Sequence, residues 1–185
     1  MKLNTIPEIL EDIKRGLMVI VMDDEDRENE GDLIMAGSLT KPSDINFMAK
    51  YGRGLICVPM EGVKLDEMDL HPMAATGRDP YRTGWAISCD AKRGITTGIS
   101  ASDRARTINI LADPKSRSSD LVKPGHIFPL RANEGGVLVR AGTHRGVRRP
   151  HKAGRRAACR GHLRNHERRW FDGKAARPDG FFQEV

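Results

Sequence analysis

The chain has 185 residues, of which 38% are hydrophobic and 30% are charged, a size and balance that suit one domain with a buried core. No apolar run approaches the length of a membrane span, and three cysteines at no regular spacing exclude a disulfide framework and favour the reducing cytoplasm. The formal net charge of +6 arises at the C-terminal end alone, because residues 1–142 hold 19 Lys and Arg against 21 Asp and Glu, whereas residues 143–185 hold 12 against 4.

The first part of the chain alternates between predicted helices and strands. Apolar side chains on one face predict a helix over residues 5–16, in which Pro7 takes an early position and Gly16 marks the end. Ser43 is a candidate cap for a second helix that reaches Tyr51. Buried strands are predicted from the apolar runs at residues 17–22, 32–38 and 55–60.

The alternation continues to residue 142. A strand is predicted over residues 85–90, and a helix is expected to begin at Ser102 and Asp103 and to stop before Pro114. Residues 116–125 are typical of a loop, and further strands are predicted over residues 126–132 and 135–140. This order of elements predicts an α/β or α+β fold, with one mixed sheet flanked by helices in a single domain.

The most unusual stretch is DDEDRENEGD at residues 23–32, in which seven of ten side chains are carboxylates. It follows a predicted strand directly, and open sheets bind their ligands at strand ends. A hard divalent cation such as Mg²⁺ would offset the repulsion among the carboxylates. A solvated acidic turn explains the same residues without a ligand, so the stretch alone leaves both interpretations open.

Two further stretches contain candidate binding or catalytic groups. GITTGISASDR at residues 94–104 leads into a predicted helix, where backbone N–H groups favour phosphate, although an ordinary capped turn is the alternative. PGHIFPLRA places His126 next to Gly125 and between two prolines, on rigid backbone that could hold the imidazole for proton transfer near neutral pH. A lone histidine is more often structural, so this motif is also open when taken alone.

Five stretches together resemble 3,4-dihydroxy-2-butanone 4-phosphate synthases: DDEDRENEGDLIMA, GRGLICVPM, GITTGISASDRARTI, DLVKPGHIFPLRA and GGVLVRAG. They span nearly all of residues 5–142. The resemblance implies conversion of ribulose 5-phosphate into 3,4-dihydroxy-2-butanone 4-phosphate and formate in riboflavin biosynthesis, with Mg²⁺ or Mn²⁺ as cofactor. It also implies a homodimer with active sites at the subunit interface.

The same resemblance implies catalytic and metal-binding roles by position. Glu28 is the implied metal ligand, and His144 is the candidate for a second one. Asp32 is a substrate contact and candidate proton acceptor, and Cys57 lines the pocket. His126 is the essential acid/base group.

The remaining implied contacts bind substrate. Arg27 lies in the acidic loop beside Glu28, and Thr97 is expected to help hold the phosphate that Arg140 pairs with. The implied substrate-binding segment continues directly after Arg140 with Ala141, Gly142, Thr143 and His144.

The resemblance ends after Gly142, where the family pattern continues HTEA, then a helix, then a strand of the type GVICEI. This chain reads THRG, so His144 stands one position beyond the family's second metal ligand. Residues 143–185 contain only three Ile, Leu or Val but ten Arg, and no helix or strand period emerges. We predict that this segment results from a shift of the reading frame. Its first residues can be written with codons that encode HTEA when they are read one base later.

The domain organisation expected from this break is a synthase domain at residues 1–142, incomplete at its C-terminal end, and a poorly ordered Arg-rich tail at residues 143–185. Losing a helix and a strand costs several kcal/mol against a total stability of about 5–15 kcal/mol, so we expect a weakly active or inactive chain. One alternative is an inactive synthase remnant, and another is binding of RNA or DNA through the tail. A small-molecule substrate is the partner expected, and neither a membrane nor a nucleic acid is.

Overall fold

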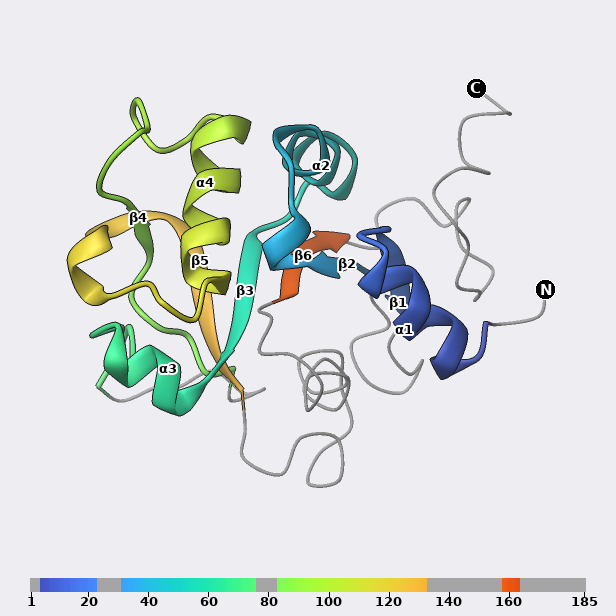
Figure 1. Cartoon of the computed structure of the whole chain (residues 1–185), viewed down its shortest axis with the longest axis horizontal. Coiled ribbons are helices and arrows are strands. Elements are labelled where there is room, and N and C mark those ends of the chain that lie inside the picture. Colours follow the sequence, from blue (N-terminus) through green and yellow to red (C-terminus); the bar gives the residue numbers. More distant parts are fainter. Residues whose placement is uncertain (1–3, 23–30, 76–82, 133–157, 164–185) are drawn as a thin grey trace.

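The computed structural model describes residues 4–22, 31–75, 83–132 and 158–163 (Figure 1). These residues form one six-stranded sheet in the order β1-β2-β6-β3-β5-β4. Strands β3 and β5 are parallel, and all other neighbours are antiparallel. The prediction of a mixed sheet is therefore confirmed. The strands are β1 (Val19–Met22), β2 (Gly31–Ala36), β3 (Ile56–Glu61), β4 (Cys89–Ala91), β5 (Leu121–Ala132) and β6 (Ala158–Leu163).

Helices cover both faces of this sheet (Figure 1). The main core lies on the face under α2, α3 and α4, where Ile45, Leu65 and Ile108 are fully buried. Helix α1 packs through Ile9 and Ile13 against a smaller cluster on the other face. The helices are α1 (Ile6–Lys14), α2 (Pro42–Phe47), α3 (Gly62–Glu67) and α4 (Ala101–Ala112), with a π-helical turn, η2 (Met48–Gly52), directly after α2 and 3-10 turns at η1 (Gly37–Leu39) and η3 (Ser118–Asp120).

Several predicted boundaries are wrong for identifiable reasons. Helix α4 is capped by Ser100, whose Oγ accepts from Asp103 N at 3.0 Å, so Ser102 and Asp103 lie inside the helix. The strand predicted over residues 85–90 is reduced to β4 and two isolated bridges made by Trp85 and Ala86. Helix α3 was not predicted, because six residues are too few to show a helical period.

Strand β5 begins at Leu121, five residues before the predicted start. Pro124 and Gly125 are turn residues in sequence terms, which is why residues 116–125 were expected to be a loop. In the structure they lie within β5, where its pairing with β4 shifts register.

Within residues 143–185, whose sequence shows no helix or strand period, the structure describes one strand, β6. This strand lies between β2 and β3 and is antiparallel to both, with Gly161 opposite Leu33 on one side and Ile56 on the other. Strand pairing uses backbone N–H and C=O groups, which any sequence supplies, and β6 pairs the inner edges of β2 and β3. The division at residue 142 stays a prediction, and residues 133–157, with the strand predicted at 135–140, lie outside the described residues.

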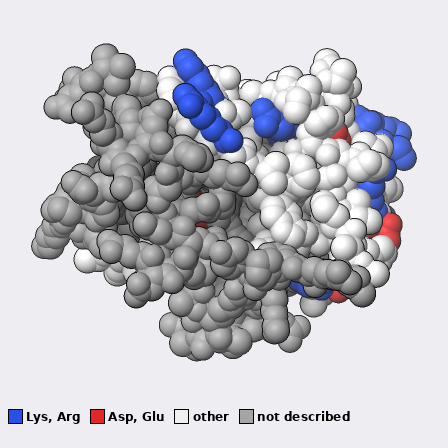
Figure 2. Space-filling model, turned by 180° about the vertical axis from the view of Figure 1, so that it is seen from behind, with Lys and Arg blue, Asp and Glu red and all other residues white. Residues whose placement is uncertain are grey.

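On the face seen in Figure 2, the described Lys and Arg side chains stand in separate groups with uncharged surface between them. The alternative of nucleic-acid binding rests on the tail after residue 142, of which only residues 158–163 are described. Among the described helices, none is both long and apolar enough to cross a membrane.

Candidate active site

Three of the predicted site residues share one face of the sheet. Asp32 on β2, Cys57 on β3 and His126 on β5 each stand next to a residue that is buried in the main core. Because side chains alternate along a strand, the three lie on the face opposite that core. The neighbours that point into the core are Leu33, Ile56 and Ile127.

The register fixes how far apart these residues lie. Ile34 pairs with Arg160 of β6, which pairs with Cys57, which in turn pairs with Phe128 of β5. Asp32 and His126 each precede this row by two residues on strands that run in the same direction, so they stand level with each other. Three strand intervals separate them, or about 14 Å at the usual strand spacing.

His126 is held by an irregularity between β4 and β5. Cys89 pairs with Ile127, whereas the next residue, Asp90, pairs with Val122, so residues 123–126 have no ladder partner on β4. The side chains of β4 and its neighbour replace the missing ladder bonds. Asp90 Oδ1 accepts from His126 N at 2.9 Å, and Ser88 Oγ accepts from Gly125 N at 3.2 Å.

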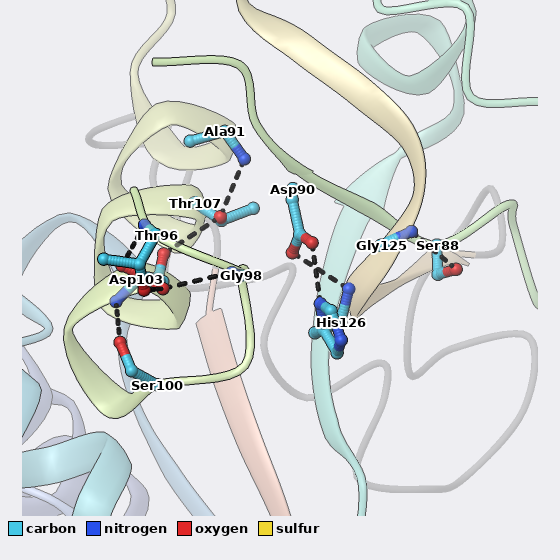
Figure 3. Close-up of polar contacts among 10 residues, drawn as sticks. All are labelled: Ser88, Asp90, Ala91, Thr96, Gly98, Ser100, Asp103, Thr107, Gly125 and His126. Atoms are coloured by element: carbon cyan, nitrogen blue, oxygen red, sulfur yellow. Dashed lines mark hydrogen bonds and ion pairs between the residues drawn. The ribbon is translucent and has the colours of Figure 1, made fainter. Parts of the chain in front are cut away.

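The second oxygen of Asp90 contacts the imidazole itself (Figure 3). Asp90 Oδ2 lies 2.7 Å from His126 Nδ1. The Asp90 side chain is only 6% exposed, whereas that of His126 is 39% exposed. A buried carboxylate at Nδ1 favours a proton on that nitrogen, which leaves Nε2 as the basic atom, and His126 is thereby oriented for proton transfer.

The loop at residues 94–100 is a capped turn rather than an open phosphate cradle. Asp103, a buried residue in the first turn of α4, accepts hydrogen bonds from Thr96 N at 3.1 Å, Thr96 Oγ1 at 2.7 Å and Gly98 N at 3.0 Å. These bonds, led by that from the Thr96 hydroxyl, hold the pKa of Asp103 below its ordinary value. Two loop amides are therefore used internally, and exposed Thr97 between them is the predicted phosphate contact that this loop presents.

Cys57 and Cys89 differ in position. Cys57 is 4% exposed and lies on the same face as His126. Cys89 is fully buried in the main core, where burial, and to a lesser degree the charge of Asp90, raises the pKa of its thiol to about 12. Cys89 is therefore an inert core residue, and Cys57 is the thiol whose position fits the candidate site.

The predicted metal ligands and most substrate contacts fall outside the described residues. These are Arg27, Glu28, Arg140, Ala141, Gly142, Thr143 and His144. Within the described ranges, no three His, Cys, Asp or Glu side chains are grouped so as to hold a metal ion. The described part nevertheless places the Asp32 carboxylate, an oxygen donor of the type that hard cations prefer, directly after the acidic loop.

Sequence reasoning missed Asp90 and Asp103 as residues of the site. Asp90 lies 36 residues before His126, so no local pattern connects them. Asp103 was read as a helix cap, although its side chain holds the preceding loop. The glycine at position 98 was a usable signal, because Gly before a helix often marks a close backbone approach.

Comparison with known sequences gives one family. A model of the family 3,4-dihydroxy-2-butanone 4-phosphate synthase matches residues 7–158. The chain is 56% identical over 143 residues to riboflavin biosynthesis protein RibBA of Aquifex aeolicus, and 54% identical over 146 residues to 3,4-dihydroxy-2-butanone 4-phosphate synthase of Neisseria meningitidis serogroup B. These matches cover 76% and 78% of the chain but only 35% and 40% of the two relatives.

Solved structures agree with the sequences. A 3,4-dihydroxy-2-butanone 4-phosphate synthase in complex with two magnesium ions is similar with a TM-score of 0.83 at 34% identity, over 94% of this chain and 84% of that one. The Candida albicans synthase gives 0.79 at 40% identity, over 98% and 88%. The chain belongs to the 3,4-dihydroxy-2-butanone 4-phosphate synthase family.

Proposed function

We propose that this chain derives from a riboflavin-pathway synthase that converts ribulose 5-phosphate into 3,4-dihydroxy-2-butanone 4-phosphate and formate. The observation that carries the proposal is the position of Asp32, Cys57 and His126 on one sheet face in a chain more than 50% identical to named synthases. This reaction begins with removal of a proton next to a ketone, which requires a base held on rigid backbone. His126, fixed by Asp90 through two hydrogen bonds, meets that requirement.

The described residues suit distinct roles in this reaction. His126 Nε2 exchanges protons with substrate oxygens or carbons, while Asp90 keeps the ring oriented through its contact with Nδ1. Asp32 is a second proton acceptor near the acidic loop. Cys57 lies on the same face of the sheet, and the Thr97 hydroxyl binds the phosphate.

A divalent cation is part of the proposal. Glu28 and His144 are the proposed ligands, with Arg27 and the segment from Arg140 to Thr143 binding substrate beside them. Bound Mg²⁺ or Mn²⁺ supplies Lewis acidity toward the substrate's oxygens. The proposed ligands suit such an ion, because Mg²⁺ and Mn²⁺ prefer carboxylate and imidazole ligands to the thiolates that are typical of a structural zinc site.

The spacing of the site supports a homodimer. Asp32 and His126 of one chain stand about 14 Å apart, three strand intervals at the usual spacing, which is too far for both to act on one small sugar phosphate. Two copies related by a two-fold axis would bring Asp32 of one copy to His126 of the other. Mixing an Asp32→Asn variant with a His126→Ala variant tests this in a chain that carries a relative's segment after Gly142, because mixed dimers regain one intact site and release formate.

The altered segment after Gly142 is proposed to weaken the enzyme, because it replaces the second metal-ligand position and the residues that follow. A cytoplasmic location remains a prediction from the cysteine content.

The decisive experiment compares two chains in a Mg²⁺-dependent assay of formate release from ribulose 5-phosphate. One is the chain as it stands, and the other, the repaired chain, carries the corresponding segment of the Neisseria meningitidis relative after Gly142. We expect formate from the repaired chain and little or none from the natural one. Absence of formate from the repaired chain overturns the function, and equal turnover by both overturns the proposed defect.

A further inference from the structure

We propose that Asp103 is a positioning residue that holds the loop at residues 94–100 against the Asp90–His126 pair, and so controls the orientation of the imidazole. Its catalytic meaning rests on the proposed function, but its structural effect on His126 does not. Asp103 contacts no reacting atom in the proposed reaction. It acts on His126 through Gly98.

The carboxylate of Asp103 is committed to the loop. Both of its oxygens are used, Oδ1 by Thr96 N and Oδ2 by Thr96 Oγ1 and Gly98 N. The residue is 4% exposed, so little water competes for these donors. An ordinary helix cap bonds the first-turn amides of its own helix, and Ser100 already does so here. Asp103 therefore does more than cap α4.

The loop that Asp103 holds contacts the Asp90–His126 pair through Gly98 (Figure 3). A Cβ built on Gly98 would lie 2.7 Å from His126 Nδ1 and even closer to Asp90 Oδ2. Gly98 also has a φ of +95°, which side chains rarely adopt. The backbone of Gly98 thus packs directly on the hydrogen bond between Asp90 and His126.

This packing has two consequences for His126. It covers the Asp90 carboxylate, so water cannot replace Nδ1 as its partner, and a hydrogen bond shielded from water is stronger. It also fixes Thr97, because the residues on both sides of it are bonded to one carboxylate. Releasing the loop is expected to free both the imidazole and the proposed phosphate contact.

The test uses the full chain labelled with ¹⁵N and the variant Asp103→Asn. In either orientation of the new amide, Thr96 N or Gly98 N loses its acceptor. Ring ¹⁵N shifts, recorded at a pH where imidazoles are neutral and assigned by their loss in His126→Gln, report which ring nitrogen carries the proton. We expect Nδ1–H in the parent, a clear rise of Nε2–H in Asp103→Asn, and amide exchange of Gly98 faster by about tenfold or more.

Thr107→Val is the matched control for stability. Thr107 Oγ1 accepts from Ala91 N at 2.9 Å and donates to Asp103 O at 3.0 Å, so its loss weakens the same helix without touching the loop bonds. We expect its His126 spectrum to match the parent even where its unfolding midpoint falls as far. If Asp103→Asn leaves the His126 signals unchanged, or if Thr107→Val changes them equally, the proposal is overturned.

Gly98→Ala provides a second, independent route should Asp103→Asn fail to fold. It keeps Asp103 but inserts a methyl group between the loop and the pair, so it is expected to change the His126 signals in the same direction. A folded Gly98→Ala chain with parental His126 signals refutes the proposal.

The catalytic arm uses formate release by the repaired chain. Asp103→Asn is expected to lower kcat by about 10- to 100-fold, since small misplacements of catalytic groups have effects of this order, with a smaller change in KM. If the repaired chain is active and Asp103→Asn leaves its kcat unchanged, the result contradicts the positioning role of Asp103 but not the proposed function. Lack of formate from the repaired parent counts against the proposed function, and the spectra still decide the structural effect.

Discussion

The sheet has two sides along its strand order: β3, β5 and β4 form the first, and β1 and β2 form the second. The two sides are held in different ways. On the side of β3, β5 and β4, His126 is fixed by a buried carboxylate, a register shift and a loop tied to α4. On the side of β1 and β2, Asp32 depends on β6, a strand from a segment whose sequence has few apolar residues. The first side is held by hydrogen bonds between side chains and backbone, whereas the second is held by apolar packing of Leu33 and Ile34 and by strand pairing with β1 and β6.

The two sides also differ in how they relate to the segment after Gly142. The described hydrogen bonds of Gly125 and His126 are made with Ser88 and Asp90, which lie well before the segment that follows Gly142. Asp32 lies on the strand that pairs with β6, so its position is sensitive to what that segment can do.

The largest effect is expected from Asp90→Asn in the repaired chain. The amide can still accept from His126 N, but it donates to Nδ1 and favours the wrong tautomer. A loss of about 10²- to 10⁴-fold in kcat is expected from formate release, with KM changing far less. Asp66→Asn, which breaks a surface pair with Arg131 on the same strand, should leave kcat unchanged. A twofold loss or less in Asp90→Asn would show that Asp90 does not orient His126.

Gly161→Pro tests the other side of the sheet. Gly161 lies opposite Leu33 of β2 and Ile56 of β3, and proline removes a donor from this central position. The free energy of unfolding should fall by about 3 kcal/mol or more in urea titrations. Gly161→Ala keeps the amide and should cost much less. Equal stability of the proline variant and the parent would mean that β6 does not hold β2 and β3 together.

Thr107→Val is expected to have an intermediate effect on the first side alone. The buried Ala91 N loses its acceptor, which should cost about 1–3 kcal/mol in the free energy of unfolding. Hydrogen exchange should rise in β4 and α4 while β1 and β2 remain as in the parent. Thr107→Ser keeps the hydroxyl and is the control. Equal acceleration on both sides of the sheet would show that they open as one unit.

The smallest effect concerns acid. Hydrogen bonds from the loop lower the pKa of Asp103 in the folded chain below its ordinary value of 3.8. The stability that this provides is therefore complete above about pH 4 and is lost as the pH falls through the lowered value. The parent should lose more stability between pH 5 and pH 2 than Asp103→Asn does. Asp113→Asn, an exposed change at the end of the same helix, should follow the parent.

Much of this arrangement could be predicted from the sequence where one local pattern dominates. The apolar run before the acidic loop gave β1, and the periodic apolar residues with Pro7 gave α1. His126, Cys57 and Asp32 were identified because their motifs resemble a family, and the register brings them to one face. Their roles remain predictions.

The rest depended on contacts between distant segments. Strand β5 passes through Pro124 and Gly125 because β4 and β5 shift register there, which local turn propensity cannot show. Asp90 is connected to His126 only by the fold. Strand β6 was missed because pairing on both sides can hold a strand whose own sequence has no strand period.

Gly125 has a practical consequence for any attempt to change which substrate the proposed synthase accepts. A Cβ there would meet the backbone of Cys89 and Asp90, so the placement of the histidine is set by contact between two main chains. Substitutions elsewhere around the candidate site can therefore change its surroundings without moving His126. Directed evolution of substrate range should leave this crossing untouched and sample exposed neighbours such as Ile99.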